Sequence, residues 1–195
     1  LVSSSAASDV YKRQVIHTAG LSRPMKIHDH NISKSIELNI IGTANIVKAC
    51  NKFNIKLIYI STGYVYEGTK GNYSEEDSVK PFNNYGWSKL GGECSVKMYN
   101  NSLILRVTMT EKPFNFKTAY TNLISNFMYH EDFVGILPKL INKKGIINVG
   151  GKSQSIYKFA KSKNIKVKKA RLQNSKKLPL LQSMSLKKLT SILKK

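Results

Sequence analysis

The chain has 195 residues, of which 41% are hydrophobic, enough to bury the core of one ordinary domain or of one domain and part of another. It contains no apolar run of the roughly 20 residues that cross a bilayer and no apolar stretch of a secretory signal, so we expect a cytoplasmic protein with no membrane partner. The two cysteines, Cys50 and Cys94, lack the spacing of a metal or redox pair, and we interpret them as buried, reduced thiols.

The formal net charge of +21 is compatible with nucleic-acid binding, because clustered cations bind phosphate backbones. Only four of the 32 basic residues are arginine, whose forked guanidinium recognises phosphates and bases best, and the lysines are spread along the whole chain. Abundant Lys, Asn and Ile are typical of an AT-rich coding sequence. We therefore expect no nucleic-acid partner, and we interpret the densest basic run, 161–177, as a solvated surface or the neighbourhood of a sugar phosphate.

Residues 1–14 do not share the pattern of the rest of the chain. The segment SSAASDVYKRQ, Ser4 to Gln14, has no apolar periodicity and is similar to the translation of a transposase adapter used to prepare sequencing libraries. We expect this segment to be a non-native artefact. The natural sequence would then begin at Val15, and the parent protein would extend further upstream.

Strands and helices alternate in the prediction from Val15 onward. VIHTAG (15–20) is a short apolar run that ends in small residues, as in a buried parallel strand leading into a ligand-facing loop. Apolar residues at helical spacing predict a helix over 31–53, with Asn31 as its cap. KLIYIS (56–61), rich in β-branched and aromatic residues, predicts the next strand.

The polar stretch 63–84 predicts a long loop, and long loops in compact domains usually serve a site. A helix over 85–99 and a buried strand over 102–108 follow. This alternation predicts a doubly wound α/β sheet, whose ligands bind at the carboxyl ends of the strands. We therefore expect the loops after VIH, YIS and ILR to share one crevice.

The pattern is looser after Glu111, and no internal repeat is present. The apolar spacing predicts helices over 117–128, 131–141, 153–163 and 185–194, and a strand and turn over 145–151.

Five segments, in order, resemble the extended short-chain dehydrogenase/reductase family, and within it the dTDP-4-dehydrorhamnose reductase type. They are VIHTAG, ELNIIGTANIVKAC, YISTGYVYEGTKGNYSEED, YGWSKLGGE and LILRVT, which together span about half of the chain, 15–108. The ordered set is more specific than a lone Tyr-x-x-x-Lys. The resemblance implies an incomplete Rossmann-type sheet over 15–110 and part of a smaller substrate-binding lobe over 111–195.

Tyr85 and Lys89 lie four positions apart, so on a helix both side chains emerge on one face and can reach one bound molecule. The resemblance implies that Tyr85 is the acid/base of a hydride transfer. A free tyrosine has a pKa of about 10, so a nearby cation must stabilise its phenolate, and Lys89 supplies that charge. The alternative is an ordinary exposed pair on a helix.

The same resemblance assigns the remaining site residues. Thr62 would bind the reacting sugar oxygen, or it could simply end a strand. Asn39 would support Lys89, or its side chain could satisfy a local carbonyl. The cofactor, NAD or NADP, would lie against Thr18, Ala19 and Gly20 as well as Tyr85 and Lys89. The substrate would meet Thr62, Gly63, Tyr64 and Arg106, although Arg106 could instead pair with Glu93.

No histidine spacing indicates a metal site, and we interpret His17 as a packed strand residue. The glycine-rich dinucleotide fingerprint is absent, as is the residue that selects NAD or NADP, and Gly63 stands where the reductase type has Asp. We therefore expect a fragment of an NAD(P)-dependent nucleotide-sugar reductase. As written, this fragment should bind cofactor negligibly and tend to aggregate. We expect the intact parent to form a homodimer. The alternatives are an epimerase or dehydratase of the same fold and a non-catalytic regulatory subunit.

Overall fold

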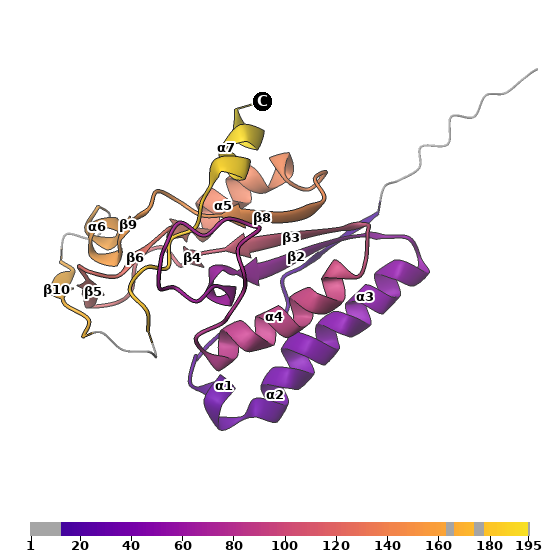
Figure 1. The fold of residues 1–195 in the computed structure, drawn as a ribbon, viewed down its shortest axis with the longest axis horizontal. Coiled ribbons are helices and arrows are strands. Elements are labelled where there is room, and N and C mark those ends of the chain that lie inside the picture. The colour runs from indigo at the N-terminus through magenta and orange to yellow at the C-terminus, as the bar shows by residue number, and fades with distance from the viewer. Residues whose placement is uncertain (1–12, 163–165, 174–177, 195) are drawn as a thin grey trace, which may run out of the picture.

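A four-stranded parallel sheet forms the centre of the computed structural model, which describes residues 13–162, 166–173 and 178–194 (Figure 1). The strands lie in the order β1-β2-β3-β8, and each neighbouring pair is parallel. Their bounds are β1 (Gln14–His17), β2 (Lys56–Thr62), β3 (Ser102–Val107) and β8 (Gly145–Val149). The predicted parallel α/β sheet is confirmed, and residues on both sides of the predicted division at residue 110 build it.

Two predicted segments lie partly outside the described residues. The segment expected to be non-native is described only from residue 13, and its last residue, Gln14, begins β1. The lysine-rich run is described at 161–162 and 166–173. Both interpretations stay predictions.

Helices cover both faces of the sheet (Figure 1). One face carries α3 (Gly42–Lys52) and α4 (Asn84–Lys97), and the other carries α5 (His130–Ile136) and α7 (Lys187–Leu193). Along β2, Leu57 and Tyr59 pack into the core under α3 and α4, whereas Ile58 and Ile60 pack into the core under α5 and α7. Burial on both faces is typical of a parallel sheet. Of the helices described, none has both the length and the apolar character to span a membrane.

The helix predicted over 31–53 is confirmed, with one irregular turn. After a short helix α1 (Ile27–His30), it runs through α2 (Ile32–Ile36), a π-helical turn η1 (Glu37–Ile41) and α3. The Asn31 side chain caps it by accepting a 2.9 Å hydrogen bond from the Lys34 amide. π-Helical turns are frequent at functional sites, and this one contains the buried Asn39.

A smaller lobe is built from three two-stranded sheets and α6 (Ile156–Lys161). The strand pairs are β4 (Met109–Thr110) with β7 (Met128–Tyr129), β5 (Thr118–Tyr120) with β10 (Lys168–Ala170), and β6 (Ile124–Ser125) with β9 (Gln154–Ser155). The helix predicted over 117–128 is therefore wrong. Pairing with segments distant in sequence overrides its local helical spacing.

The other late elements are confirmed with shorter bounds. The helix predicted over 131–141 appears as α5 followed by a 3-10 turn, η3 (Leu137–Lys139). The predicted strand over 145–151 is β8, and the last two predicted helices are α6 and α7.

The two cysteines have different surroundings. Cys50 is buried in the core under α3 and α4, as expected. Cys94 is exposed on α4, so the prediction that both thiols are buried is wrong for this residue. Both thiols are free, as predicted.

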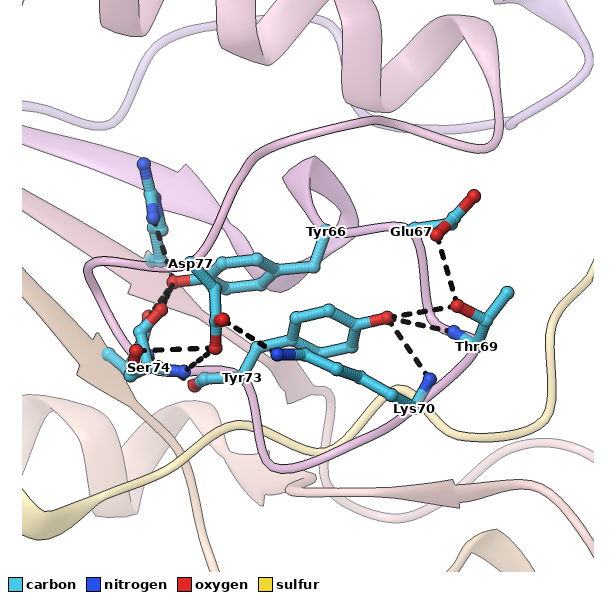
Figure 2. A network of polar contacts seen from close by, with 9 residues as sticks. Tyr66, Glu67, Thr69, Lys70, Tyr73, Ser74 and Asp77 are labelled. Carbon is cyan, nitrogen blue, oxygen red and sulfur yellow. Dashed lines mark hydrogen bonds and ion pairs between the residues drawn. The ribbon is translucent and has the colours of Figure 1, made fainter.

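The loop predicted over 63–84 is an ordered structure that starts with a 3-10 turn, η2 (Gly63–Val65) (Figure 2). The rings of Tyr66 and Tyr73 stack with their centroids 4.8 Å apart. The Tyr73 hydroxyl accepts hydrogen bonds from the backbone amides of Thr69 and Lys70, and the Lys70 ammonium pairs with Asp77 at 2.6 Å. These contacts hold the loop in one shape beside the ends of the strands.

Helix α4 lies very close to the π-helical turn, and Gly92 makes this approach possible. A Cβ atom at position 92 would lie 2.5 Å from the Asn39 carbonyl oxygen and 2.7 Å from the Tyr59 hydroxyl. Both distances are shorter than real carbon contacts. The close approach brings the helix that carries Tyr85 and Lys89 next to the turn that carries Asn39.

We expect Gly92→Ala to lower the free energy of unfolding by about 1–3 kcal/mol, because the added methyl group pushes α4 away from a carbonyl that cannot move freely. Urea denaturation measures the change. Gly135→Ala in α5 is the matched control, because nothing lies within 4 Å of its Cβ position and alanine favours the helix. Equal stability of the two variants would contradict this reading of the contact.

Candidate active site

A cavity of about 600 Å³ opens at the carboxyl ends of β1, β2 and β3. Segments that follow each of these strands line it, as do the first turns of α4 and the smaller lobe. Its polar side includes Thr18, Gly20, Thr62, Tyr85 and Lys89. The prediction that the loops after three strands share one crevice is confirmed.

Tyr85 and Lys89 both face this cavity from α4. The Asn83 side chain caps the helix by accepting a 2.8 Å hydrogen bond from the Gly86 amide, which fixes where its first turn begins. Lys89 is only 7% exposed. The alternative of an exposed helical pair is therefore excluded.

Burial changes the acid strength of both groups. It raises the pKa of Tyr85 to about 12, although the neighbouring Thr62 hydroxyl lowers it. Burial also lowers the pKa of Lys89 to about 8, although the Glu93 carboxylate raises it. At neutral pH the phenol therefore holds its proton while the ammonium holds its charge, which is the combination a proton donor with a supporting cation needs.

The Lys89 ammonium lies over an aromatic ring. Its Nζ atom is 4.2 Å from the centroid of the Tyr59 ring, a cation–π contact, and the Tyr59 hydroxyl donates a 3.2 Å hydrogen bond to the Lys89 carbonyl. Within the described residues, no protein atom accepts a hydrogen bond from this Nζ. Its N–H groups remain available to a ligand in the cavity.

Asn39 connects the segment after β1 to α4. Its side-chain amide donates 2.8 Å hydrogen bonds to the Leu21 carbonyl and to the Ser88 hydroxyl, and its oxygen accepts one of 2.6 Å from the Leu21 amide. The Ser88 hydroxyl in turn donates to the Tyr85 carbonyl at 2.8 Å. Asn39 thus holds the segment after β1 against α4, and its predicted support of Lys89 stays a prediction.

Thr18, Ala19 and Gly20, the residues predicted to bind the cofactor, are exposed after β1, and Thr18 and Gly20 line the cavity. Ala19 is not among the lining residues. A Cβ at Gly20 would lie 2.9 Å from the Asn39 side-chain oxygen, so glycine allows this segment to approach the π-helical turn. Their contact with a cofactor stays a prediction.

Thr62, the last residue of β2, and the two residues that follow it occupy different places. Thr62 and Tyr64 line the cavity, and the Thr62 hydroxyl accepts a 3.2 Å hydrogen bond from the Tyr64 amide. Gly63 is buried behind them, where a Cβ would lie 2.7 Å from the Thr108 hydroxyl. Any larger residue at position 63, an aspartate included, would require Thr108 to move.

Arg106 pairs with Glu93 in the interior rather than facing the cavity. The two side chains are 4% and 3% exposed, and the guanidinium also donates a 2.7 Å hydrogen bond to the Tyr66 hydroxyl. The Ser61 hydroxyl donates to Glu93 at 2.8 Å. Of the two alternatives for Arg106, the structure contains the ion pair, and contact with substrate stays a prediction.

The histidines do not gather into a metal site, and no group of ligating side chains occurs among the residues described. His17 is buried in β1 with its Nε2 atom 3.1 Å from the Thr43 hydroxyl, which fits the expected packed strand residue. His28 is buried against the Tyr85 ring, with centroids 5.1 Å apart, and its Nδ1 atom is 2.7 Å from the Ser35 hydroxyl. Burial lowers the pKa of His28, so this ring is a neutral support for Tyr85.

The apolar wall on the far side of the cavity was not indicated by the sequence patterns. This wall comes from the smaller lobe, where the helix predicted over 117–128 hid the alternation of its short strands. Its side chains are those of Phe114, Phe116, Tyr120, Leu123, Phe127 and Ile156. Tyr59 and Ser88 were also missed, although the small polar residue between Tyr85 and Lys89 was visible in the motif.

The fold and site define a Rossmann-type α/β protein with a tyrosine and a lysine at the carboxyl ends of parallel strands. The family model described as "RmlD substrate binding domain" matches residues 4–127. The chain belongs to this family, in agreement with the expected dTDP-4-dehydrorhamnose reductase type.

Proteins with two different names are similar to parts of this chain. Methionine adenosyltransferase 2 subunit beta of Bos taurus is 36% identical over 100 residues, which are 51% of this chain and 30% of that protein. The dTDP-4-dehydrorhamnose reductase of Aggregatibacter actinomycetemcomitans is 29% identical over 133 residues, 66% of this chain and 44% of that protein. The chain thus spans less than half the length of either relative.

Solved structures show the same fold. A dTDP-4-dehydrorhamnose reductase from Bacillus anthracis in complex with NADP has a TM-score of 0.79 and 24% identity, covering 92% of this chain and 73% of that one. A hypothetical dTDP-4-dehydrorhamnose reductase from Sulfolobus tokodaii has a TM-score of 0.78 and 26% identity, with the same coverage.

The Glu93–Arg106 pair provides a test of how α4 is held. We expect Glu93→Leu to lower the free energy of unfolding by about 3–5 kcal/mol, because it leaves the Arg106 charge buried without its partner. The matched control is the double variant Glu93→Leu/Arg106→Met, which removes both charges and should cost much less. Urea denaturation of both proteins checks this, and an equal loss in both would show that packing, not the unpaired charge, is responsible.

Proposed function

We propose that the chain acts in an NAD(P)-dependent reductase of nucleotide-linked sugars, of the dTDP-4-dehydrorhamnose reductase type. The observation that carries the proposal is that Thr62, Tyr85 and Lys89 line one cavity, in which the phenol holds its proton and the ammonium holds its charge at neutral pH. The names of the similar proteins support the substrate class.

The residues present fit a nicotinamide cofactor. The Lys89 ammonium donates no hydrogen bond to a described protein atom, and its N–H groups suit the hydroxyl groups of a ribose. The exposed backbone at Thr18 and Gly20 faces the same cavity. When bound, NADH or NADPH would supply the hydride.

The chain's own residues handle the proton. Tyr85 donates its phenolic proton to the carbonyl oxygen of the sugar as negative charge develops there. The Thr62 hydroxyl hydrogen-bonds to the same oxygen and orients it. Lys89 stabilises the phenolate that remains, because its charge lies one helical turn away on the same face of α4.

A second candidate is a binding subunit without catalysis. It is favoured by the 36% identity to a protein named as a subunit of methionine adenosyltransferase. An epimerase or dehydratase of the same fold would use the same tyrosine and lysine. Consumption of NADPH with a nucleotide-linked keto sugar supports the reductase, whereas nucleotide binding without turnover supports the subunit.

Tyr85→Phe tests the acid. The variant keeps the ring against His28 and removes only the hydroxyl. In a protein extended to the full length of the relatives, we expect turnover of a nucleotide-linked keto sugar to fall by about 10²-fold or more while NADPH affinity stays the same. NADPH absorbance and calorimetric titration give the two readings. Tyr157→Phe, which deletes a hydroxyl outside the cavity, is the control. Unchanged turnover in the Tyr85 variant would remove this residue from the mechanism.

Lys89 gives the reaction a pH limit. Because burial lowers its pKa to about 8, the ammonium loses its proton as the pH rises through that value, well below the usual range of lysine. We expect kcat/KM to fall above about pH 8, while Tyr85, with a pKa of about 12, stays protonated. A pH–rate profile measures this, and Lys89→Met should have low activity without that limb. A flat profile from pH 7 to about 10 would contradict the assignment.

A further inference from the structure

An ion pair bridges the cavity between its two walls. Arg23 lies in the segment after β1, and Glu111 follows β4 in the smaller lobe, yet the Arg23 guanidinium lies 2.9 Å from the Glu111 carboxylate. Both residues line the cavity. The side chains are 50% and 53% exposed, so the pair is at the mouth and not in the interior.

Arg23 and Glu111 are two of the few charged side chains that line the cavity. Among the described residues that line the cavity, Arg23 and Lys89 are the only lysine or arginine side chains, and Glu111 is the only carboxylate. Lys89 is buried at the reacting end against Tyr59. Arg23 is therefore the cation that an anionic group entering from solvent meets first.

Arg23 also lies near the reacting end of the cavity. Its charge lowers the pKa of both Tyr64 and Tyr85, opposing the effect of burial. Its partner Glu111 is followed in the chain by Phe114 and Phe116, whose ring centroids lie 5.3 Å apart and which also line the cavity. The cavity that contains this guanidinium therefore offers polar groups suited to a sugar and aromatic rings suited to a planar base.

We propose that Arg23 binds the diphosphate of a nucleotide-linked substrate and that Glu111 competes with the diphosphate for the same guanidinium. The identity of the ligand rests on the proposed function. A forked guanidinium binds two phosphate oxygens at once and does so more strongly than it pairs with an exposed carboxylate. An exposed ion pair contributes little to stability, so exchanging Glu111 for a phosphate costs the fold little.

Competition predicts opposite effects for the two partners. Arg23→Ala removes the ligand's cation and should weaken binding, whereas Glu111→Gln frees the guanidinium and should strengthen binding. If the pair only held the two walls together, both variants would weaken binding in the same way.

The experiment is calorimetric titration of the 195-residue chain with dTDP and with UDP, in the absence of cofactor. We expect Arg23→Ala to raise the Kd by about 10-fold to 100-fold, the loss of a charge-assisted contact, and Glu111→Gln to lower it by about 2-fold to 5-fold. Lys80→Ala breaks an ion pair of similar exposure, with Glu67, whose residues do not line the cavity, and should leave the Kd unchanged. Circular dichroism confirms that each variant is folded.

Each result has a definite meaning. An unchanged Kd in Arg23→Ala, weaker binding in both variants, or no binding of either nucleotide by the original chain would overturn the proposal. NADPH turnover with a nucleotide-linked keto sugar is measured separately on a protein extended to the full length of the relatives that carries the same substitutions, because the 195-residue chain is expected to bind cofactor negligibly. Opposite shifts in Kd without turnover would support the diphosphate site while contradicting the reductase, and turnover with an unchanged Kd in Arg23→Ala would do the reverse.

Discussion

The buried ion pair between Glu93 and Arg106 determines where helix α4 sits on the sheet. Two opposite charges lie in the interior, and each needs the other because an unpaired buried charge is very unfavourable. Glu93 belongs to α4 and Arg106 to β3, while Ser61, which also binds Glu93, precedes Thr62 at the end of β2. The position of α4 along two central strands is therefore set, and with it the distance of its tyrosine and lysine from Thr62.

The same ion pair extends into the loop after β2. Arg106 donates to the Tyr66 hydroxyl, whose single proton has two acceptors within 2.9 Å, the Asn148 side-chain oxygen on β8 and the Ser74 carbonyl oxygen. Tyr66 in turn stacks on Tyr73, and this contact fixes the position of the next part of the loop (Figure 2). A segment that polarity alone marks as a loop is in this way fixed by side chains reaching it from two strands.

The cavity has two chemically different ends because two parts of the fold contribute to it. The sheet and α4 supply hydroxyl groups, the phenol and the ammonium, whereas the smaller lobe supplies aromatic and aliphatic side chains. Placing the Lys89 charge over the Tyr59 ring, instead of against a carboxylate, keeps its hydrogen-bond donors free for a ligand. This arrangement explains how a buried lysine can remain both charged and available.

The sequence by itself determined the parallel α/β sheet, the cap at Asn31, the crevice and the placement of Tyr85 and Lys89 on one face of a helix, because helical and strand periodicity and the four-residue spacing are local properties of the chain. Only the tertiary structure decided the short strands of the smaller lobe, the choice of Glu93 as the partner of Arg106, and the bridge from Arg23 to Glu111. These features join residues far apart in sequence. Strand pairing and burial select them, and their energies depend on neighbours that no local pattern contains.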